Sequence, residues 1–292
     1  MKNLSDTCHL TPVTPPRYIL TLSCKDVRGI VASVTGFLAE HYGFIIESAQ
    51  FGDASTGQFF LRIEFEIEPS GPSEDGLKKL FHDKVGERFG MQWQIAGKHQ
   101  KSRVLIMVSK LGHCLNDLLY RASTDQLAID IPAIISNHED LKHVADRYSV
   151  PFYSVPAKDE AAQWEIIQRH KVDVVILARY MQVLSADMCA KLQGRAINIH
   201  HSFLPSFKGA RPYHQAFDRG VKLIGATAHY VTTDLDEGPI IEQEVARVDH
   251  TYLPEDLAAI GRDTECQALA RALRYHIEHR VLLNGSKTVV FK

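Results

Sequence analysis

Three side chains between Ala196 and Pro239 have the types and spacing needed for acid–base chemistry at a carbonyl group. Asn198 and His200 are two positions apart in a short apolar run, so in a strand both side chains leave the same face. Asp236 follows in a turn that ends in Gly238-Pro239. An amide N–H can hold an oxyanion, an imidazole can move a proton and a carboxylate can orient the imidazole. We therefore predict a reaction site here, the alternative being the polar end of a buried strand.

Alternating apolar and amphipathic segments predict the element that carries this site. Strands are expected at 103–109, 129–136, 151–155, 172–177 and 196–199, and helices at 114–122, 139–148, 161–170 and 187–192. Further strands are expected at 223–231, 239–246 and 288–291, with a long helix at 254–280. This order predicts a Rossmann-like α/β domain over 103–292. Ligands of such sheets bind at the carboxyl ends of the strands, where Asn198 and His200 fall.

The residues before this domain have a different pattern. Residues 1–16 are polar and predict a loose tail. Strands at 18–24, 44–51, 58–67 and 91–96, with helices at 26–41 and 74–89, give the order βαββαβ of a ferredoxin-like domain over 17–97. The first helix is expected to bury one face, formed by Val31, Val34, Phe37 and Leu38. Residues 98–102 form a short basic linker, so the chain is predicted to have two domains.

Composition excludes several classes of protein. A formal net charge of -2 without a long basic run argues against a nucleic-acid partner, and the apolar runs are too short to span a membrane. Five cysteines without any C-x-x-C pair indicate neither a disulfide framework nor a zinc ribbon. The first residues lack the apolar core of a signal peptide. We therefore expect a cytoplasmic protein.

Two motifs around the trio carry a family resemblance. The chain reads N-I-H-x-S-F-L-P-S-F-K-G from Asn198 and H-Y-V-T-x-x-L-D-x-G-P from His229. Together they resemble the signature of the folate-dependent formyltransferase family, and the resemblance extends from about Ser102 to the C-terminus. It implies that Asn198, His200 and Asp236 are the catalytic residues. Many fixed positions at two distant places make this motif far more specific than a single N-x-H.

The same resemblance implies a folate pocket. By matching, the segment 179–184 corresponds to the part of the family that grips and sandwiches the pterin ring, and its mixed aromatic and apolar content suits a flat heterocycle. His229 is expected to support the site, although it could equally be a hydrogen-bonded core histidine. The segment 209–213 is expected to border the site. The implied substrate-binding residues are Arg179, Tyr180, Met181, Gln182, Val183, Leu184, Ile197, His229 and Thr233.

The first loop of the domain distinguishes branches of this family. Members with a phosphorylated amine as acceptor hold its phosphate with a G-x-G-S-N turn. The corresponding residues 109–116 contain one glycine and the bulky His113 and Leu115, so we predict that they fill the acceptor groove. Together with the N-terminal module, this resembles the branch in which water accepts the formyl group. The implied reaction is hydrolysis of 10-formyltetrahydrofolate to tetrahydrofolate and formate, which supplies formate for purine synthesis and balances the one-carbon pool. Folate is then the substrate, and no cofactor or metal is expected.

The N-terminal module resembles an ACT regulatory domain. The turn D-x-x-G-I-V begins at Asp26 and opens the first helix. The resemblance implies an amino-acid effector, such as glycine or methionine, bound near Asp26, Arg28, Gly29 and Ile30. Such modules commonly pair through their sheets, which implies a homo-oligomer, either a dimer or a tetramer. A module that only dimerises remains an alternative.

Three other functions are compatible with parts of the pattern. The chain could transfer the formyl group to a small amine, or it could be a sensor without catalytic activity. It could also be a metal-dependent hydrolase with His200, His201 and His229 as ligands. Against the metal, adjacent His200 and His201 are expected to point to opposite faces of a strand.

Overall fold

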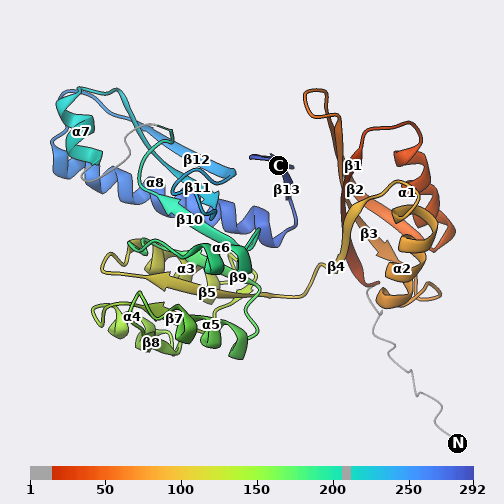
Figure 1. The fold of residues 1–292 in the computed structure, drawn as a ribbon, viewed down its shortest axis with the longest axis horizontal. Helices are drawn as coiled ribbons and strands as arrows, with labels where there is room; N and C mark the ends of the chain where they lie inside the picture. Colours follow the sequence, from red (N-terminus) through yellow and green to blue (C-terminus); the bar gives the residue numbers. More distant parts are fainter. Residues whose placement is uncertain (1–14, 206–211) are drawn as a thin grey trace, which may run out of the picture. The chain divides into compact units, whose positions relative to one another are not determined.

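The computed structural model describes residues 15–205 and 212–292, which belong to two compact units (Figure 1). Unit 1 extends to His99, and unit 2 comprises Gln100–Lys292. The division falls inside the segment 98–102 that we interpret as a linker. The predicted tail at 1–16 lies outside the described residues, apart from its last two.

Unit 1 is a four-stranded antiparallel sheet with the predicted βαββαβ order of elements. Its sheet has the strand order β2-β3-β1-β4, so the first strand lies between the third and the fourth. The elements are β1 Arg17–Lys25, α1 Ile30–Glu40, β2 Gly43–Asp53, β3 Gln58–Ile67, α2 Glu74–Phe81, η1 His82–Gly86 and β4 Gln92–Gly97.

The core of unit 1 lies between this sheet and helices α1 and α2. Alternate residues of β3 contribute to it together with four residues of α1, which are Ile30, Val34, Phe37 and Leu38. The predicted helix face is wrong at one position, because Val31 is 37% exposed. The helix begins at Ile30, and positions 30, 34, 37 and 38 follow the i, i+4, i+7, i+8 pattern of a buried face.

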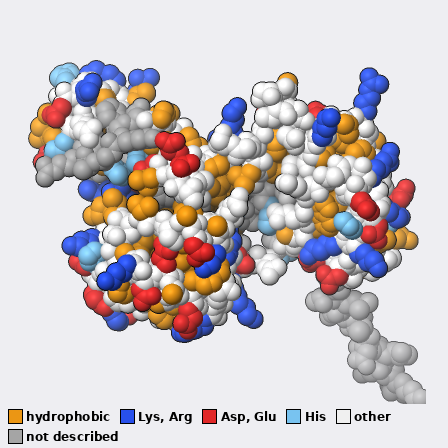
Figure 2. Space-filling view, viewed as in Figure 1, with side chains coloured by type: hydrophobic (Ala, Val, Ile, Leu, Met, Phe, Trp, Pro, Cys, Tyr) orange, Lys and Arg blue, Asp and Glu red, His pale blue; other side chains and the backbone are white. Residues whose placement is uncertain are grey.

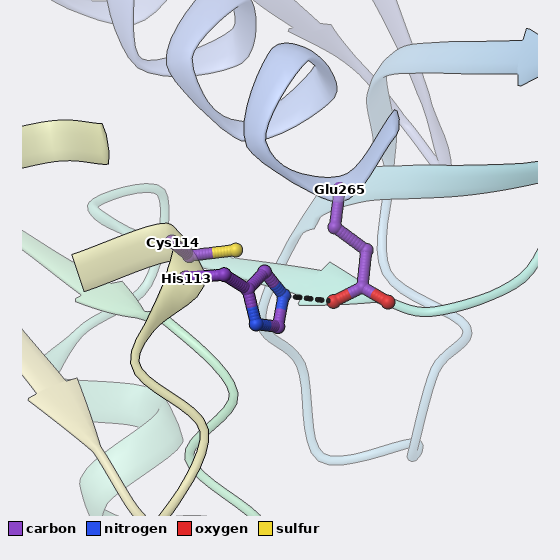
Figure 3. A group of neighbouring side chains, drawn as sticks. All are labelled: His113, Cys114 and Glu265. Atoms are coloured by element: carbon purple, nitrogen blue, oxygen red, sulfur yellow. Dashed lines mark hydrogen bonds and ion pairs between the residues drawn. The ribbon is translucent and has the colours of Figure 1, made fainter. Parts of the chain in front are cut away.

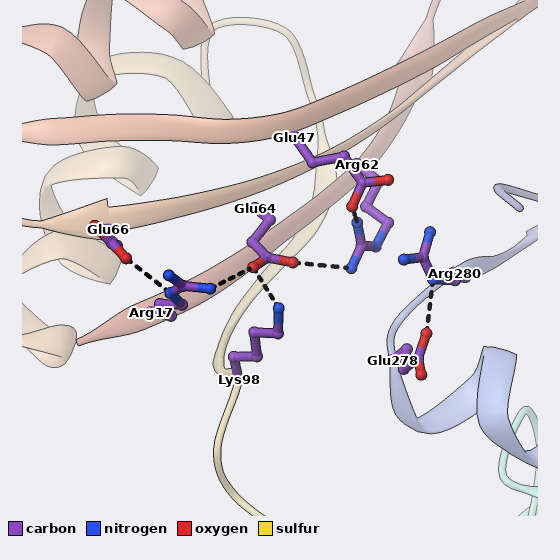
Figure 4. A network of polar contacts seen from close by, with 8 residues as sticks. All are labelled: Arg17, Glu47, Arg62, Glu64, Glu66, Lys98, Glu278 and Arg280. Atoms are coloured by element: carbon purple, nitrogen blue, oxygen red, sulfur yellow. Dashed lines mark hydrogen bonds and ion pairs between the residues drawn. The ribbon is translucent and has the colours of Figure 1, made fainter. Parts of the chain in front are cut away.

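Three residues of β3 between the core positions, Arg62, Glu64 and Glu66, carry paired charges (Figure 4). Arg62 is 1% exposed, and its Nη1 lies 3.1 Å from Oε2 of Glu47. Its Nη2 lies 3.9 Å from Glu64, which also contacts Arg17 and Lys98. Because a buried charge without a partner is strongly destabilising, this network requires the strands to keep their register.

The second predicted helix of unit 1 is shorter than expected. Instead of continuing to residue 89, α2 ends at Phe81 and is followed by the wider π-helical turn η1. The N–H of Glu87 donates to the carbonyl of His82, five residues earlier, at 3.0 Å. Gly86 lies against the ring of Trp93, where an added Cβ would come within 2.6 Å of Nε1. The backbone of the π-helical turn therefore lies directly against this ring.

Unit 2 is a Rossmann-type α/β domain, as predicted. Its eight-stranded sheet has the order β12-β11-β10-β9-β5-β7-β8, with β6 paired to β5. Strands β10, β9, β5, β7 and β8 are parallel, whereas β11 and β12 are antiparallel to their neighbours. Strands are β5 Ser102–Val108, β6 Ile129–Asp130, β7 Ile134–Ser136, β8 Phe152–Ser154, β9 Val174–Leu177, β10 Ala196–His200, β11 Leu223–Tyr230, β12 Ile240–Arg247, β13 Val281–Asn284 and β14 Lys287–Val290. Helices are α3 His113–Ser123, α4 Lys142–Arg147, α5 Glu160–Arg169, α6 Ala186–Lys191, α7 Pro212–Asp218 and α8 Pro254–Ile277.

Helices cover both faces of the large sheet. One hydrophobic cluster joins it to α3, α4 and α8, and a second joins the other face to α5 and α6. The long α8 contacts β10, β11 and β12 and also packs on α3 (Figure 1). Pro254 begins α8 and the Asp256 carboxylate accepts from the N–H of Leu253 at 2.9 Å, which is a favourable helix start. The antiparallel end of the sheet is therefore backed by one continuous helix.

Three elements of unit 2 differ most from their predicted bounds. The strand expected at 129–136 is two short strands, β6 and β7, because Pro132 between them has no N–H for the sheet. Helix α4 begins at Lys142 rather than 139. Helix α8 ends at Ile277, after which β13 pairs with β14.

Five helices end with the same backbone feature. The second residue after each of α1, α3, α4, α5 and α8 has a positive φ although it is not glycine. The five angles lie between 47° and 62°. Glycine is the usual residue at this position because other residues are strained there. These residues are Tyr42, Asp125, Ser149, Lys171 and His279.

The visible surface has no large area of one charge. In Figure 2, acidic and basic side chains are interspersed over both units. No helix in the described part of the chain is long and apolar enough to cross a membrane.

Candidate active site

The carboxyl end of β10 and the turn after β11 bring the predicted trio together. Asn198 and His200 leave the same side of β10, as their spacing predicts. In the antiparallel pairing with β11, Asn198 stands opposite His229. Asp236 lies in the following turn with a φ of 57°. Residues from two strands and one turn therefore converge at this edge of the sheet.

Hydrogen bonds and ion pairs connect the four polar residues. Nδ1 of His200 lies 3.2 Å from Oδ2 of Asp236, and Nε2 of His229 lies 3.8 Å from Oδ1 of the same carboxylate. Nδ2 of Asn198 is 3.2 Å from Nε2 of His229. The carbonyl of Tyr230 accepts from Nδ1 of His229 at 2.9 Å. Asp236 thus binds the imidazole of His200, while His229 accepts from Asn198 and lies next to the carboxylate.

The electrostatics of the site favour an ionised Asp236. The contact with His200, followed by that with His229, holds the pKa of the Asp236 carboxyl well below its usual range. His200 is 5% exposed, and its Nε2 is buried without a hydrogen-bond partner among the described residues. Because Nδ1 faces the carboxylate, Nε2 is the atom that can exchange a proton with a bound molecule.

A cavity of about 380 Å³ opens beside the trio. Its lining contains Asn198, His200 and Asp236, all six residues of the segment 179–184, and the predicted His229 and Thr233. The assignment of Ile197 to the substrate-binding residues is corrected, because this residue is fully buried in the core and does not line the cavity. Strand alternation turns it away from Asn198.

Sequence reasoning did not assign several lining residues. Most of these residues stand next to the motifs in the chain. Their position beside a motif was therefore the signal that could have identified them from the sequence. The N–H of Met181 donates to the Ser109 hydroxyl at 3.1 Å, which ties this wall of the cavity to the end of β5. The unassigned lining residues are Leu177, Cys189, Ile199, His201, Val231, Thr232, Asp234 and Leu235.

His201 does not point away from His200 as expected. The two rings are stacked, with centroids 4.8 Å apart and an interplanar angle of 28°. Strand β10 ends at His200, so the alternation of a strand does not extend to His201. Both imidazoles line the cavity, and the argument from opposite faces against a metal is wrong.

The residues predicted to fill an acceptor groove form the start of a helix and do not line this cavity. Helix α3 begins at His113, and Cys114 and Leu115 are fully buried in the hydrophobic core. None of the three lines the cavity. The stretch is the first turn of a helix rather than a loop, so Cys114 and Leu115 face inward.

His113 instead belongs to a buried polar cluster around Glu265 of α8 (Figure 3). Its Nε2 is 2.7 Å from Oε2 of Glu265, which is 1% exposed. The hydroxyl of Tyr213 donates to Oε1 at 2.8 Å, and Nε of Arg179 lies 3.5 Å from Oε2. Burial alone raises the pKa of Glu265, but the contacts from His113, Arg179 and Tyr213 outweigh it and leave the pKa lowered. Of the segment 209–213, predicted to border the site, residues 209–211 lie outside the described residues.

Comparisons with known proteins identify the family. Residues 102–273 match the model of the formyl transferase family. A formyltetrahydrofolate deformylase of a Corynebacterium species is 50% identical over 94% of this chain and 98% of its own. The Bacillus subtilis formyltetrahydrofolate deformylase is 47% identical over 93% of each chain. The chain belongs to the formyltetrahydrofolate deformylase family.

Solved structures separate this family from the transferases. The crystal structure of formyltetrahydrofolate deformylase from Burkholderia mallei has a TM-score of 0.91 and 51% identity, and the match covers 95% of this chain and 100% of that one. A phosphoribosylglycinamide formyltransferase from Anaplasma phagocytophilum has a TM-score of 0.62 and 30% identity, covering 66% of this chain and 96% of its own. The likeness to formyltetrahydrofolate deformylases therefore extends over both units, whereas the likeness to the transferase does not. The predicted membership of the hydrolytic branch is confirmed.

Proposed function

We infer that the chain hydrolyses 10-formyltetrahydrofolate to tetrahydrofolate and formate. The observation that carries this function is the His200–Asp236 pair, 3.2 Å apart in the wall of a cavity, in a chain that resembles formyltetrahydrofolate deformylases over nearly its whole length. The roles of individual residues are our proposal.

Asn198 is assigned to the oxyanion. The formyl group on N10 is an amide-like carbonyl, and attack by water passes through a tetrahedral oxyanion. A side-chain N–H of Asn198 can donate to this oxygen from the cavity wall. A donor of this kind is typically worth ~3 kcal/mol of transition-state stabilisation.

His200 and Asp236 are assigned to proton transfer. Asp236 accepts from Nδ1 of His200, which orients the ring and leaves Nε2 for the reacting atoms. The water oxygen bonds to the formyl carbon, the carbon–N10 bond breaks, one proton goes to N10 and the second is lost with formation of the formate anion. Asp236 remains ionised throughout and stabilises the protonated imidazole.

The segment 179–184 is assigned to the pterin ring. Met181 and Val183 are 58% and 69% exposed although they are apolar. Both line the cavity, where a flat heterocycle would cover them. His229 and Thr233 also line the cavity, and we assign them polar contacts with the substrate. In this proposal folate is the substrate, and the reaction requires neither a cofactor nor a metal.

Purified protein is expected to release formate from 10-formyltetrahydrofolate without any acceptor. Glycinamide ribonucleotide at millimolar concentration is expected neither to accept the formyl group nor to compete with the substrate. The reaction can be followed by coupling formate to a dehydrogenase and by mass spectrometry of the nucleotide. Formylated glycinamide ribonucleotide would show that the chain is a transferase instead.

Activity is expected to survive exhaustive treatment with EDTA. The proposed steps use only side-chain donors, acceptors and a water molecule. The measurement is the rate of formate release before and after chelation, with metal content checked by elemental analysis. Loss of turnover that zinc restores would mean that His200, His201 and His229 act through an ion.

We further propose that unit 1 is an ACT domain that binds an amino acid. The sheet order and the βαββαβ elements support this interpretation. Gly29, with a φ of 93°, precedes α1, and the residues 26–29 are exposed. Ile30 is 2% exposed in the core, so only its backbone could contact an effector. We also propose that such units pair, so that the chain forms a dimer or a tetramer. The proposed location is the cytoplasm, where the released formate would supply purine synthesis.

Arg28→Ala is expected to weaken the response to an amino-acid effector at least ~10-fold, in the range of a lost charge-assisted hydrogen bond. Basal hydrolysis should be unchanged, since Arg28 belongs to unit 1. Formate release is measured while glycine or methionine is titrated. The matched control is Arg88→Ala, which removes another exposed arginine of the same unit. Equal responses in wild type and Arg28→Ala would remove this turn from the effector site.

A further inference from the structure

Arg179 has an unusual position at the end of β9. Its φ is 63°, a left-handed conformation that strains an arginine side chain and backbone. Its side chain is only 11% exposed, yet it is one of the residues that line the cavity. A strained, largely buried arginine beside a reaction site is costly to maintain and therefore points to a role in that site.

Glu265, the ion-pair partner of Arg179, compensates the charge of the guanidinium but does not accept a hydrogen bond from its Nε or Nη1. Both oxygens of Glu265 already accept short hydrogen bonds, Oε2 from His113 at 2.7 Å and Oε1 from Tyr213 at 2.8 Å. Nε of Arg179 is 3.5 Å from Oε2, and neither Nε nor Nη1 has a hydrogen-bond partner among the described residues. A buried guanidinium with unused donors favours binding of an additional acceptor.

The charge of Arg179 selects an anion over a cation. His113, Cys114 and Glu265 place three potential ligand atoms within 4.8 Å of one another, an arrangement that could also hold a metal (Figure 3). However, the guanidinium 3.5 Å from Glu265 would repel a metal ion. A guanidinium fork matches a planar carboxylate, which can accept two parallel hydrogen bonds.

We propose that Arg179 binds the carboxylate of formate, the product released in the same cavity. This inference rests on the proposed function. The formyl group of the substrate is uncharged, and the anion appears only when water adds to the carbon and the bond to N10 breaks. His200, whose buried Nε2 also lacks a partner among the described residues, lines the cavity with Arg179. Arg179 thus holds the charge that the reaction creates.

The test measures formate binding to the full-length chain in the absence of folate. ¹³C-formate is titrated and followed by NMR line broadening. Arg179→Gln is expected to weaken binding at least ~10-fold, the loss expected for a charge-assisted contact. Glu265→Gln removes the competing negative charge and is expected to strengthen binding several-fold. Arg169→Gln, at an exposed arginine of α5 paired with Glu165, is the matched control and should bind like wild type.

Opposite signs in the two variants distinguish binding from structural support. A purely structural cluster would lose formate binding in both Arg179→Gln and Glu265→Gln. Arg179→Lys keeps the charge without the planar fork, so its affinity for formate should lie below that of wild type and above that of Arg179→Gln. This conservative variant provides the test if the larger changes unfold the chain. Circular dichroism verifies folding. Unchanged formate binding in Arg179→Gln, or weakened binding in Glu265→Gln, would overturn the proposal.

A second probe separates formate from the glutamate carboxylates of folate. p-Aminobenzoylglutamate is titrated into the same variants. Loss of its binding in Arg179→Gln with unchanged formate binding would assign Arg179 to the substrate tail and overturn the formate site. Hydrolysis is assayed separately, so a chain that binds formate through Arg179 but releases none from 10-formyltetrahydrofolate would contradict the proposed function and leave the anion site intact.

Discussion

Asp236→Asn is expected to bind folate normally while turnover falls at least ~100-fold, as for loss of a positioned acid–base partner. Oδ2 of Asp236 is 3.2 Å from Nδ1 of His200, and an amide has no charge with which to stabilise the protonated ring. Asparagine tolerates the left-handed backbone of this position, where φ is 57°. The substitution therefore removes the charge without adding backbone strain.

The measurement compares the formate release rate with the dissociation constant of a non-hydrolysable folate. Asp187→Asn is the matched control, because this exposed carboxylate of α6 pairs with the surface residue Lys191. A turnover of Asp236→Asn close to that of wild type would exclude Asp236 from the mechanism. A parallel loss of folate binding would indicate a binding role instead.

Gly238→Ala is expected to lower the free energy of unfolding by about 3 kcal/mol or more, at the upper end of overpacking effects. A Cβ at Gly238 would lie 1.7 Å from the carbonyl oxygen of Tyr230 and 3.2 Å from Nδ1 of His229. The backbone cannot easily retreat, because the N–H of Tyr230 donates to the carbonyl of Pro239 at 2.9 Å. Asp236 lies two residues away, so turnover is expected to fall as well.

Urea unfolding provides the stability measurement. Gly36→Ala is the control, since Gly36 lies within α1 and a Cβ there meets no atom within 4 Å. That change should stabilise the chain by up to ~1 kcal/mol through helix propensity. Equal effects of the two substitutions would show that the turn around Gly238 adjusts freely.

Local spacing predicted much of the candidate site. Two residues in the period of a strand were sufficient to place Asn198 and His200 on one face, and both line the cavity. Asp236 was assigned to the same site by the family resemblance of its motif, because spacing alone does not connect two segments this far apart in the chain. Ile197 shows the limit of matching by resemblance. The same two-residue period turns it into the core, and the period was the better guide.

Contacts between distant segments could not be predicted in this way. Glu265 is 152 residues from His113, and their hydrogen bond exists because α8 packs on α3. The period of α8 puts Glu265 on the buried face with Leu257, Gly261 and Leu269, but it does not identify His113 as the partner. The stacking of His201 on His200 likewise depends on where β10 ends, and strand boundaries are weakly encoded by local pattern.

The residues with left-handed backbone that follow five helices are positions where substitution can raise the thermal stability of the chain. Tyr42, Ser149 and Lys171 are exposed, and each has a conformation that glycine adopts without strain. Glycine at these places would relieve roughly 1 kcal/mol of strain per position, offset in part by the greater freedom of glycine in the unfolded chain. None of the three lines the cavity, so such gains would add up without touching the chemistry. A thermostable catalyst for formate release could thus be built from helix ends alone.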